Sequence, residues 1–285
     1  MNGLRHIPLL LAAFVAAPAI AQEAPAVTPL PSPEDILSRD TLTLAAGGAM
    51  FPDYEGSDDY RFIPAIAARG RYQGFSFTTR GLYLYVDVIP DRAAKVEFDA
   101  GPIVGLRFNR TKKRLKDDVV DLLPVKKTAV EAGGFVGLSF HGLTNPYDTL
   151  AVRLDVLHDF ASAHKSTLVN PTVEFSTPLS RTTFLGASVG MEFTSNRFAD
   201  YYFSINAAES LVTGLPVFNA DGGMKNWKAG LLLNQSITGD LLHGLSIFGA
   251  ANYSRLVGDF KRSPIVSDRG SANQWLLAAG LAYTW

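Results

Sequence analysis

Residues 273–285 of this 285-residue chain read NQWLLAAGLAYTW, and apolar side chains recur at every second position. A period of two predicts a β-strand, because successive side chains of a strand point to opposite faces. One face carries aromatic residues at both of its ends and consists of Trp275, Leu277, Ala279, Leu281, Tyr283 and Trp285. Opposite them sit Gln274, Ala278, Gly280, Ala282 and Thr284, which are small or polar. Aromatic ends on an apolar stripe are typical of the two interfacial girdles of a transmembrane β-barrel.

The same alternation recurs upstream, in residues 95–108 (KVEFDAGPIVGLRF) and 150–156. A helix would bury the charges at this spacing, so we predict strands, with Pro102 marking a bulge. A soluble β-sandwich also alternates. However, the predicted strands run about 10–14 residues, which exceeds the roughly 5–6 of soluble sheets and satisfies the about 9–11 of a membrane-spanning strand.

The pattern therefore predicts an all-β fold, an antiparallel up-and-down transmembrane β-barrel in residues 41–285. We expect about 12 strands, since bacterial barrels have even strand numbers, with 10 as the alternative if the weak segment 200–208 and one other are dropped. The expected strands are 41–50, 62–72, 75–88, 95–110, 128–141, 148–159, 167–177, 181–194, 200–208, 226–238, 244–257 and 273–285.

The N-terminal residues predict export. Residues 1–21 resemble a signal peptide, with Arg5 and His6 before an apolar stretch and an A-x-A cleavage site at Ala19–Ala21. The proline-rich stretch 22–40 is then expected to be a flexible periplasmic leader. Together with the barrel, this predicts the outer membrane of a Gram-negative bacterium as the location.

Composition narrows the chemistry. The chain has no Cys, which excludes disulfides and thiolate sites, and its net charge of −1 gives no field for binding nucleic acid. The sequence also lacks a P-loop, a dinucleotide-binding fingerprint, a zinc-ligand cluster and a nucleophile elbow. We therefore expect no cofactor, no bound metal and no enzymatic activity.

Four segments together resemble one family. They are AGGAMFPDYEGSDDYRFIP (46–64), ESLVTGLPVFNADGGM (209–224), RLVGDFKRSPIV (255–266) and the terminal GLAYTW (280–285). In this order they resemble the MipA/OmpV family of outer-membrane proteins, whose members usually end in Phe where this chain has Trp285. The resemblance implies a scaffold that joins a murein lytic transglycosylase to a peptidoglycan synthase, although other members are described as porin-like. Fold and location follow from membership more firmly than activity does.

Three motifs are candidate sites. Asp53, Glu55, Asp58 and Asp59 crowd one short segment, which fits a Ca²⁺ site or, more often, an acidic turn built around Gly56. A cationic loop could contact lipopolysaccharide phosphates, meet a periplasmic partner or simply be solvated; it contains Lys112, Lys113, Arg114, Lys116, Lys126 and Lys127.

The third motif is His164-Lys165-Ser166. On a strand, His164 and Ser166 would share a face, so the imidazole could activate the hydroxyl, with Asn170 orienting the base. This arrangement would make a lipid hydrolase, but three-residue matches arise by chance and the motif falls in an expected loop.

Charged residues on the inward parity of the strands predict a polar lumen. They are Lys95, Glu97, Asp99, Arg107, Glu131, Arg153, Asp155 and Glu192. If opposite charges pair across strands they would plug the barrel, whereas unpaired rows would line a pore. The sequence therefore predicts an envelope scaffold first, a small porin-like channel second and a lipid hydrolase third.

Overall fold

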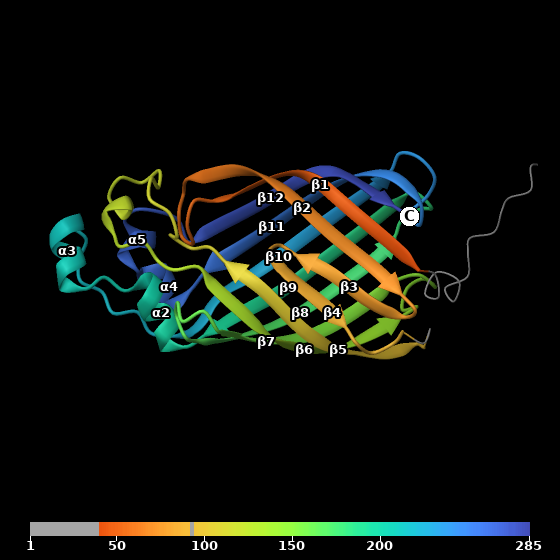
Figure 1. Ribbon diagram of the computed structural model, residues 1–285, viewed down its shortest axis with the longest axis horizontal. Helices are drawn as coiled ribbons and strands as arrows, with labels where there is room; N and C mark the ends of the chain where they lie inside the picture. The colour runs from red at the N-terminus through yellow and green to blue at the C-terminus, as the bar shows by residue number, and fades with distance from the viewer. Residues whose placement is uncertain (1–39, 92–93) are drawn as a thin grey trace, which may run out of the picture. The chain divides into compact units, whose positions relative to one another are not determined.

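In the computed structural model, residues 40–91 and 94–285 are described, and within them twelve antiparallel strands close into a barrel (Figure 1). The predicted signal peptide and leader lie outside the described residues, apart from Asp40. The strands are β1 (Thr41–Pro52), β2 (Tyr60–Tyr72), β3 (Phe75–Arg80), β4 (Tyr83–Asp87), β5 (Val96–Arg107), β6 (Ala129–His141), β7 (Thr149–Asp159), β8 (Thr167–Pro178), β9 (Thr183–Thr194), β10 (Gly223–Ser236), β11 (Gly244–Leu256) and β12 (Asn273–Thr284). The predicted fold class is confirmed.

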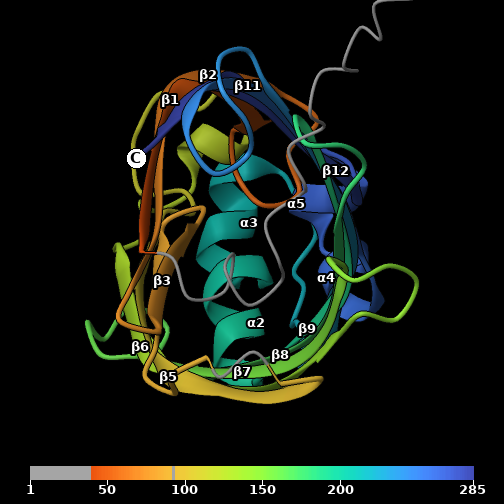
Figure 2. The same cartoon turned by 90° about the vertical axis from the view of Figure 1, so that its right-hand side faces the viewer.

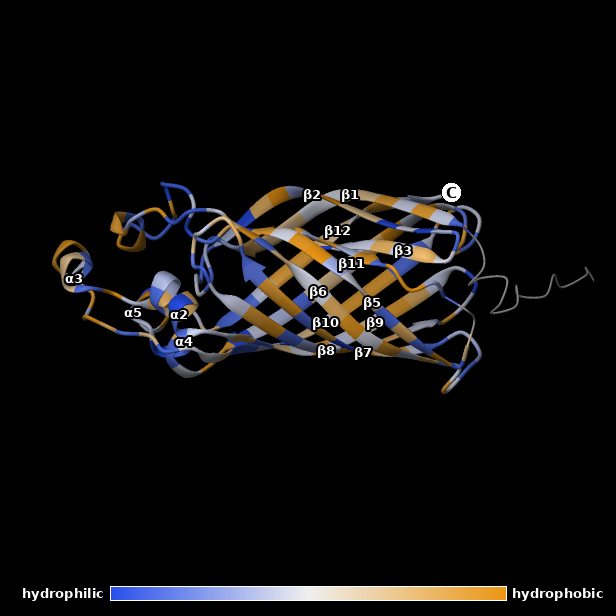
Figure 3. Cartoon of the chain, turned by 60° about the horizontal axis from the view of Figure 1, so that its bottom comes forward, coloured by the Kyte–Doolittle hydropathy of each residue, from blue (hydrophilic) through white to orange (hydrophobic). Residues whose placement is uncertain are grey.

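Pairing of the first and last strands closes the barrel. Met50 of β1 lies opposite Leu277 of β12, and the Trp285 N–H donates to the Leu42 carbonyl at 2.9 Å. The two predicted faces of the last strand are also observed, because Gln274 points inward to the turn at Gly56 and Ser57, and Trp275, Leu281 and Trp285 have the opposite, outward parity and are 46%, 50% and 52% exposed. Figure 3 shows the underlying pattern, with hydrophobic and hydrophilic residues alternating along the strands.

Two of the expected strands are wrong. Segment 75–88 is not one strand but the short hairpin β3–β4, which turns at Gly81 and Leu82. Gly81 takes a φ of +61°, which glycine adopts freely, and no Asn, Asp or Pro marked this turn. The hairpin adds a strand to the count.

Segment 200–208 is helical and removes a strand from the count. It falls in α2 (Asn196–Phe203) and the start of α3 (Ala207–Thr213). The physical reasons are an i, i+4 aromatic spacing at Phe198 and Tyr202 and a capping box in which Asn206 and Glu209 bond each other's backbone. The predicted number of twelve is thus right because the two errors compensate.

The bulge predicted at Pro102 is also wrong. The β5–β6 register runs without a shift from Val96 to Arg107, with Pro102 opposite Gly134. Pro102 is tolerated because its missing N–H lies on the β4 side, where the ladder ends at Ile103. The register shift occurs instead in β10, between Met224 and Asn226.

The two ends of the barrel differ. Residue 40, Trp285 and the short turns lie at one end, which we call the termini end. The long connections lie at the other end, the cap end, and carry α2, α3, the 3-10 helix η1 (Val120–Leu122), α4 (Gly258–Arg262) and α5 (Pro264–Ser267). Figure 2 looks along the barrel and shows α2 and α3 within the outline of the strands. None of the described helices has the length and apolarity needed to span a membrane.

Candidate functional site

Arg107 of β5 is the centre of a charged cluster near the cap end of the lumen. Its Nε lies 2.8 Å from Glu131 Oε1, its Nη1 3.3 Å from Glu55 Oε1 and its Nη2 3.1 Å from Glu192 Oε1. Lys225, at the bulge of β10, pairs with Glu55 and lies 2.9 Å from Glu192. We call these five residues the cap network.

Most of the cap network is buried, Glu55 being its most exposed member at 27%, and two further side chains complete its pairing. It contains three carboxylates and two cations, a formal balance of −3 + 2 = −1. The Tyr83 hydroxyl donates to Glu131 Oε2 at 2.7 Å, and His164 Nε2 lies 3.0 Å from Glu131 Oε1. Because the side chains of Glu131 and Lys225 are fully buried, removing either partner would strand a charge away from water.

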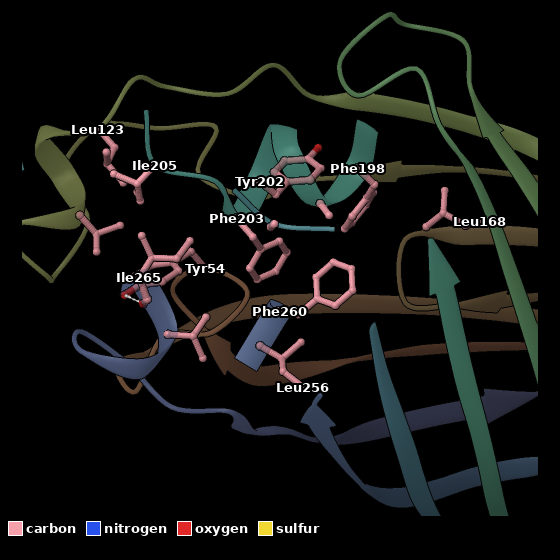
Figure 4. Packing of buried hydrophobic residues seen from close by; sticks show 14 of the residues in the cluster. Tyr54, Leu123, Leu168, Phe198, Tyr202, Phe203, Ile205, Leu256, Phe260 and Ile265 are labelled. Atoms are coloured by element: carbon pink, nitrogen blue, oxygen red, sulfur yellow. Dashed lines mark hydrogen bonds between the residues drawn. The ribbon is translucent and has the colours of Figure 1, made fainter. Parts of the chain in front are cut away.

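An aromatic cluster covers the cap network. The Phe198 ring of α2 lies 5.2 Å from the Arg107 guanidinium and 5.1 Å from the Lys225 ammonium, within cation–π range. Figure 4 shows Tyr202 and Phe203 of α2 beside Phe260 of α4 in the same buried group. All four aromatic side chains are at most 1% exposed, so the cap end of the lumen is packed rather than open.

Two loop residues anchor the cap to the barrel. The Tyr54 hydroxyl donates to the carbonyls of Ile265 and Arg269 at 3.2 and 3.1 Å, and burial raises the pKa of Tyr54 above its ordinary value. Arg110 donates to the Tyr202 carbonyl at 2.6 Å, and burial lowers the pKa of Arg110 to about 10. Arg110 therefore keeps its charge at neutral pH.

A second cluster lies farther from the cap. Arg153 Nε is 2.7 Å from Asp155 Oδ1, and its Nη1 is 3.4 Å from Glu174 Oε2. Glu174 also pairs with Arg80 of β3, while the Tyr85 hydroxyl donates to Asp155 at 2.9 Å. We call Arg80, Arg153, Asp155 and Glu174 the middle network.

Nearer the termini end, His141 Nε2 is 3.1 Å from Glu97 and the Ser139 hydroxyl donates to Asp99 at 2.5 Å. The predicted inward charges are thus confirmed as a mainly paired lumen. Two of them form no ion pair within the described residues: Asp99, whose partner is the Ser139 hydroxyl, and Lys95, which lies just before β5 and is exposed.

The opposite wall of the lumen is apolar and loosely packed. Strand parity turns Ile63 of β2, Leu232 of β10 and Leu276 of β12 inward. These side chains are nevertheless 40%, 38% and 41% exposed. The lumen below the cap therefore contains open space along this wall.

The His-x-Ser motif does not form the hypothesised nucleophile and base. His164 is buried, and its Nδ1 accepts the Ser166 backbone N–H at 3.2 Å. The Ser166 hydroxyl instead donates to the His164 carbonyl and accepts the Ser195 hydroxyl at 2.9 Å. The Asn170 side-chain oxygen has no hydrogen-bond partner within the described residues. His164 and Ser166 therefore use their polar groups in hydrogen bonds that hold the loop between β7 and β8 under the cap.

The acidic segment behaves as a turn. Asp53 pairs with Arg61, Glu55 joins the cap network, and Gly56 supplies a φ of +100°. Its carboxylates therefore point to different partners. Within residues 40–91 and 94–285, three or more potential acidic, His or Cys ligands do not converge on a metal position.

The cationic loop is folded into the cap rather than freely solvated. Lys113 donates to the Asp121 carbonyl at 3.0 Å, Lys116 to the Tyr60 carbonyl at 2.8 Å, and Lys126 lies 4.8 Å from the Tyr201 ring. Lys126 is half-buried, whereas the other five cations of the loop stay exposed, and the side chains of Lys112 and Lys127 have no hydrogen bond or ion pair within the described residues.

Sequence reasoning missed three central residues, Glu55, Lys225 and Phe198. Glu55 looked like part of an acidic turn, and Phe198 preceded a segment expected to be a strand. The signal for Phe198 was its i, i+4 spacing with Tyr202. No spacing in the sequence links Lys225 to Glu55, which lie 170 positions apart.

Comparison with known structures finds outer-membrane proteins at low similarity. A NanC porin is 10% identical over 85% of this chain and 98% of that chain, with a TM-score of 0.47. An outer-membrane channel from Pseudomonas putida F1 is 9% identical over 92% and 99%, with a TM-score of 0.48. An anion-selective porin from Comamonas acidovorans is 8% identical over 87% and 78%, with a TM-score of 0.36. Similarity at this level does not extend to activity.

A search of curated proteins finds no match. The family model described as MltA-interacting protein MipA matches residues 44–285. That range begins inside β1 and runs through the last residue, so it takes in nearly the whole barrel together with its cap. The chain therefore belongs to the MipA family.

Proposed function

We propose that this chain is a Gram-negative outer-membrane barrel that binds a peptidoglycan-remodelling enzyme and catalyses no reaction itself. The observation that carries the proposal is the packed cap end. Phe198, Tyr202 and Phe203 are fully buried there over a paired charge cluster. Such an arrangement suits a stable docking body better than an open conduit. The family description, MltA-interacting protein, supplies the partner class, a murein lytic transglycosylase, with a peptidoglycan synthase as the further partner.

Loop lengths supply the orientation. Bacterial barrels carry short turns on the periplasmic side and long loops outside. The termini end, with turns such as 142–148 and 179–182, would then face the periplasm. The cap would face outward, where exposed Lys112 and Lys127 could meet lipopolysaccharide phosphates.

Exposed aliphatic side chains at the termini end provide a docking surface. Leu143, Leu179 and Ile237 follow β6, β8 and β10 and are 55%, 59% and 56% exposed. Apolar side chains gathered on one rim mark candidate partner surfaces.

A binding titration tests the proposal. The purified full-length barrel in detergent is titrated with a lytic transglycosylase from the same organism, and a Kd of roughly micromolar order is expected for a modest interface. A variant with Leu143→Lys and Leu179→Lys should weaken binding at least tenfold. Leu211→Lys, the same type of substitution at the 89%-exposed cap position of α3, serves as the control and should leave binding unchanged. Absence of binding, or equal weakening by both variants, contradicts the proposal.

A small channel is the second candidate, because Ile63, Leu232 and Leu276 border open space in the lumen. The packed cap predicts that the wild-type barrel gives no steady conductance in planar bilayers. Steady single-channel steps from wild-type protein would favour the channel over the scaffold.

A further inference from the structure

The barrel wall contains a window. Strands β3 and β4 have 6 and 5 residues, whereas their neighbours β2 and β5 have 13 and 12 (Figure 1). Strand β2 pairs with β3 only over Arg69–Tyr72. Strand β4 pairs with β5 over Tyr83–Tyr85, and the Leu106 N–H continues this pairing by donating to the Leu82 carbonyl at 3.3 Å. Residues 60–67 of β2 therefore have no paired strand on this side. We define the window as the gap bounded by residues 60–67 of β2, the turn at Gly81–Leu82 and the end of β5 at Arg107.

Polar contacts close the window above and below. At its foot, the Thr79 hydroxyl accepts the Ala68 N–H at 2.9 Å and donates to the Ala68 carbonyl at 3.2 Å. At its top, Lys116 donates to the Tyr60 carbonyl and Arg61 donates to the Arg114 carbonyl. The backbone between these two ends is left open.

The window lies within the apolar band of the barrel. Ile66 is in register with Ala46, which is in register with Leu281 of β12. Leu281 belongs to the lipid face between Trp275 and Trp285, so Ile66 is at a height between the two aromatic girdles. Unpaired backbone groups are costly in hydrocarbon, so an occupant here needs a polar group as well as an apolar one.

The outer side of the window is an apolar hollow of about 370 Å³. Its lining includes Ile66, Thr79, Leu82, Leu84, Val104 and Leu106. Ile66 projects beside it and is 85% exposed. The volume falls within the roughly 300–1,000 Å³ of small-ligand sites, and its lining suits a hydrocarbon chain.

The polar margin of the window favours an anion. Antiparallel alternation directs the N–H groups of Ile66 and Phe62, and the carbonyls of Phe62, Pro64 and Ile66, to the same side as the N–H and C=O of Ala68, so this margin offers acceptors as well as donors and the preference for an anion rests on the side chain next to it. Just below, Arg69 has inward parity and is exposed to the lumen. Within the described residues its guanidinium forms no ion pair and no hydrogen bond. An unpaired cation on the lumen side thus lies just below an opening in the wall whose outer side is the apolar hollow, so a ligand that reaches both must pass through the window.

We propose that the window binds a long-chain fatty acid, with its carboxylate at Arg69 and its chain in the hollow. A single anionic head and a single chain match one unpaired guanidinium and one hollow. The carboxylate accepts hydrogen bonds from donors that hydrocarbon leaves unsatisfied. This site is independent of partner binding at the termini end.

Photo-crosslinking tests the proposal on the full barrel in lipid nanodiscs. The probe is palmitate with a diazirine near the end of its chain, and adducts are expected on Ile66, Leu82 and residues 104–106. Arg69→Gln should reduce the adduct yield at least fivefold. The matched control, Arg197→Gln on the exposed cap helix, should not change it. The probe's methyl ester should label the window at least fivefold less than the acid. Boiling-dependent gel mobility confirms that each variant is folded.

Three results would overturn the site. If Arg69→Gln, or the methyl ester of the probe, gave the same adduct yield as the wild-type barrel with the free acid, the ion pair between Arg69 and the carboxylate would be excluded. Labelling spread evenly over Leu231, Ile247 and Leu281 would indicate ordinary annular lipid. In this cysteine-free chain, an Ile66→Cys variant that forms disulfide-linked dimers and excludes the probe would assign the open strand edge to a second copy.

Discussion

The cap network and the middle network are both ion-pair clusters in one lumen, but they differ in their contact with water. In the cap network the side chains of Glu131 and Lys225 are fully buried under Phe198. In the middle network Asp155 is also buried, but the pair between Arg80 and Glu174 keeps side-chain exposures of 38% and 23%, and the contrast with the cap network lies in that pair. Burial makes an unpaired charge costly, whereas water can replace a lost partner in the middle network. The same chemistry therefore holds the structure together in one place and contributes little in the other.

The largest expected effect comes from removing the buried cation. Lys225→Met leaves Glu192 and Glu55 sharing only Arg107, and breaking such a buried pair should lower the free energy of unfolding by about 3–5 kcal/mol. Urea unfolding in lipid vesicles measures this. The control Lys261→Met, on the exposed face of α4, should stay within about 0.5 kcal/mol of wild type. A similar loss for both lysines would show that burial does not distinguish them.

A smaller decrease in the free energy of unfolding is expected when the aromatic cluster over the cap network is loosened. Phe198→Leu keeps an apolar side chain but removes the ring over Arg107 and Lys225, which should cost about 1–2 kcal/mol. Wild-type protein should be silent in planar bilayers, and the variant should show intermittent conductance as the cap loosens. Phe160→Leu, at a 69%-exposed position, serves as the control. Unchanged stability and silence in both variants would mean that the ring does not seal the lumen.

Removing one charged partner from the middle network should change the free energy of unfolding only a little. Glu174→Gln removes the partner shared by Arg80 and Arg153, yet a partly exposed pair contributes only about 0–1 kcal/mol. The effect should shrink further at high salt, because ions screen exposed pairs. Urea unfolding at low and high salt checks both statements. A loss as large as that of Lys225→Met would erase the contrast between the networks.

The smallest expected effect is a pH-dependent loss of stability confined to the turn at 142–148, which Asp148 holds together. Asp148 accepts the Thr144 hydroxyl at 2.5 Å and the N–H groups of Leu143 and Thr144 at 2.7 Å, and these bonds lower the pKa of Asp148 to about 2. A depressed carboxyl pKa means that the ionised form stabilises the turn above the unfolded pKa of about 3.9.

The stabilisation of the turn by ionised Asp148 should therefore be complete above about pH 4 and disappear as the pH falls through about 2. Hydrogen exchange at the Leu143 and Thr144 amides follows the turn. Asp148→Asn should exchange faster at neutral pH and lose the acid dependence. Wild-type protection that is unchanged at pH 2 would contradict this account.

The sequence predicted the wall of the barrel better than its details. Alternation in segments such as 95–108 correctly separated lipid-facing from inward residues, because strand parity is a local property. It failed at 75–88, where the alternation continues through the turn at Gly81, and at 200–208, where aromatic residues fit a helix as well as a strand. The window follows from the first failure, since it exists only because β3 and β4 are short.

The chain by itself determined that it forms a membrane-spanning β-barrel with aromatic girdles and a charged interior. These properties depend on residue type and a period of two, which are both written locally. Only the tertiary structure decided which charges meet. Barrel closure brings Glu55, from the first turn, to Lys225 of β10, and the cap helix α2 places Phe198 over both Arg107 and Lys225. Contacts between residues so distant in sequence depend on strand register and loop folding, which no local pattern specifies.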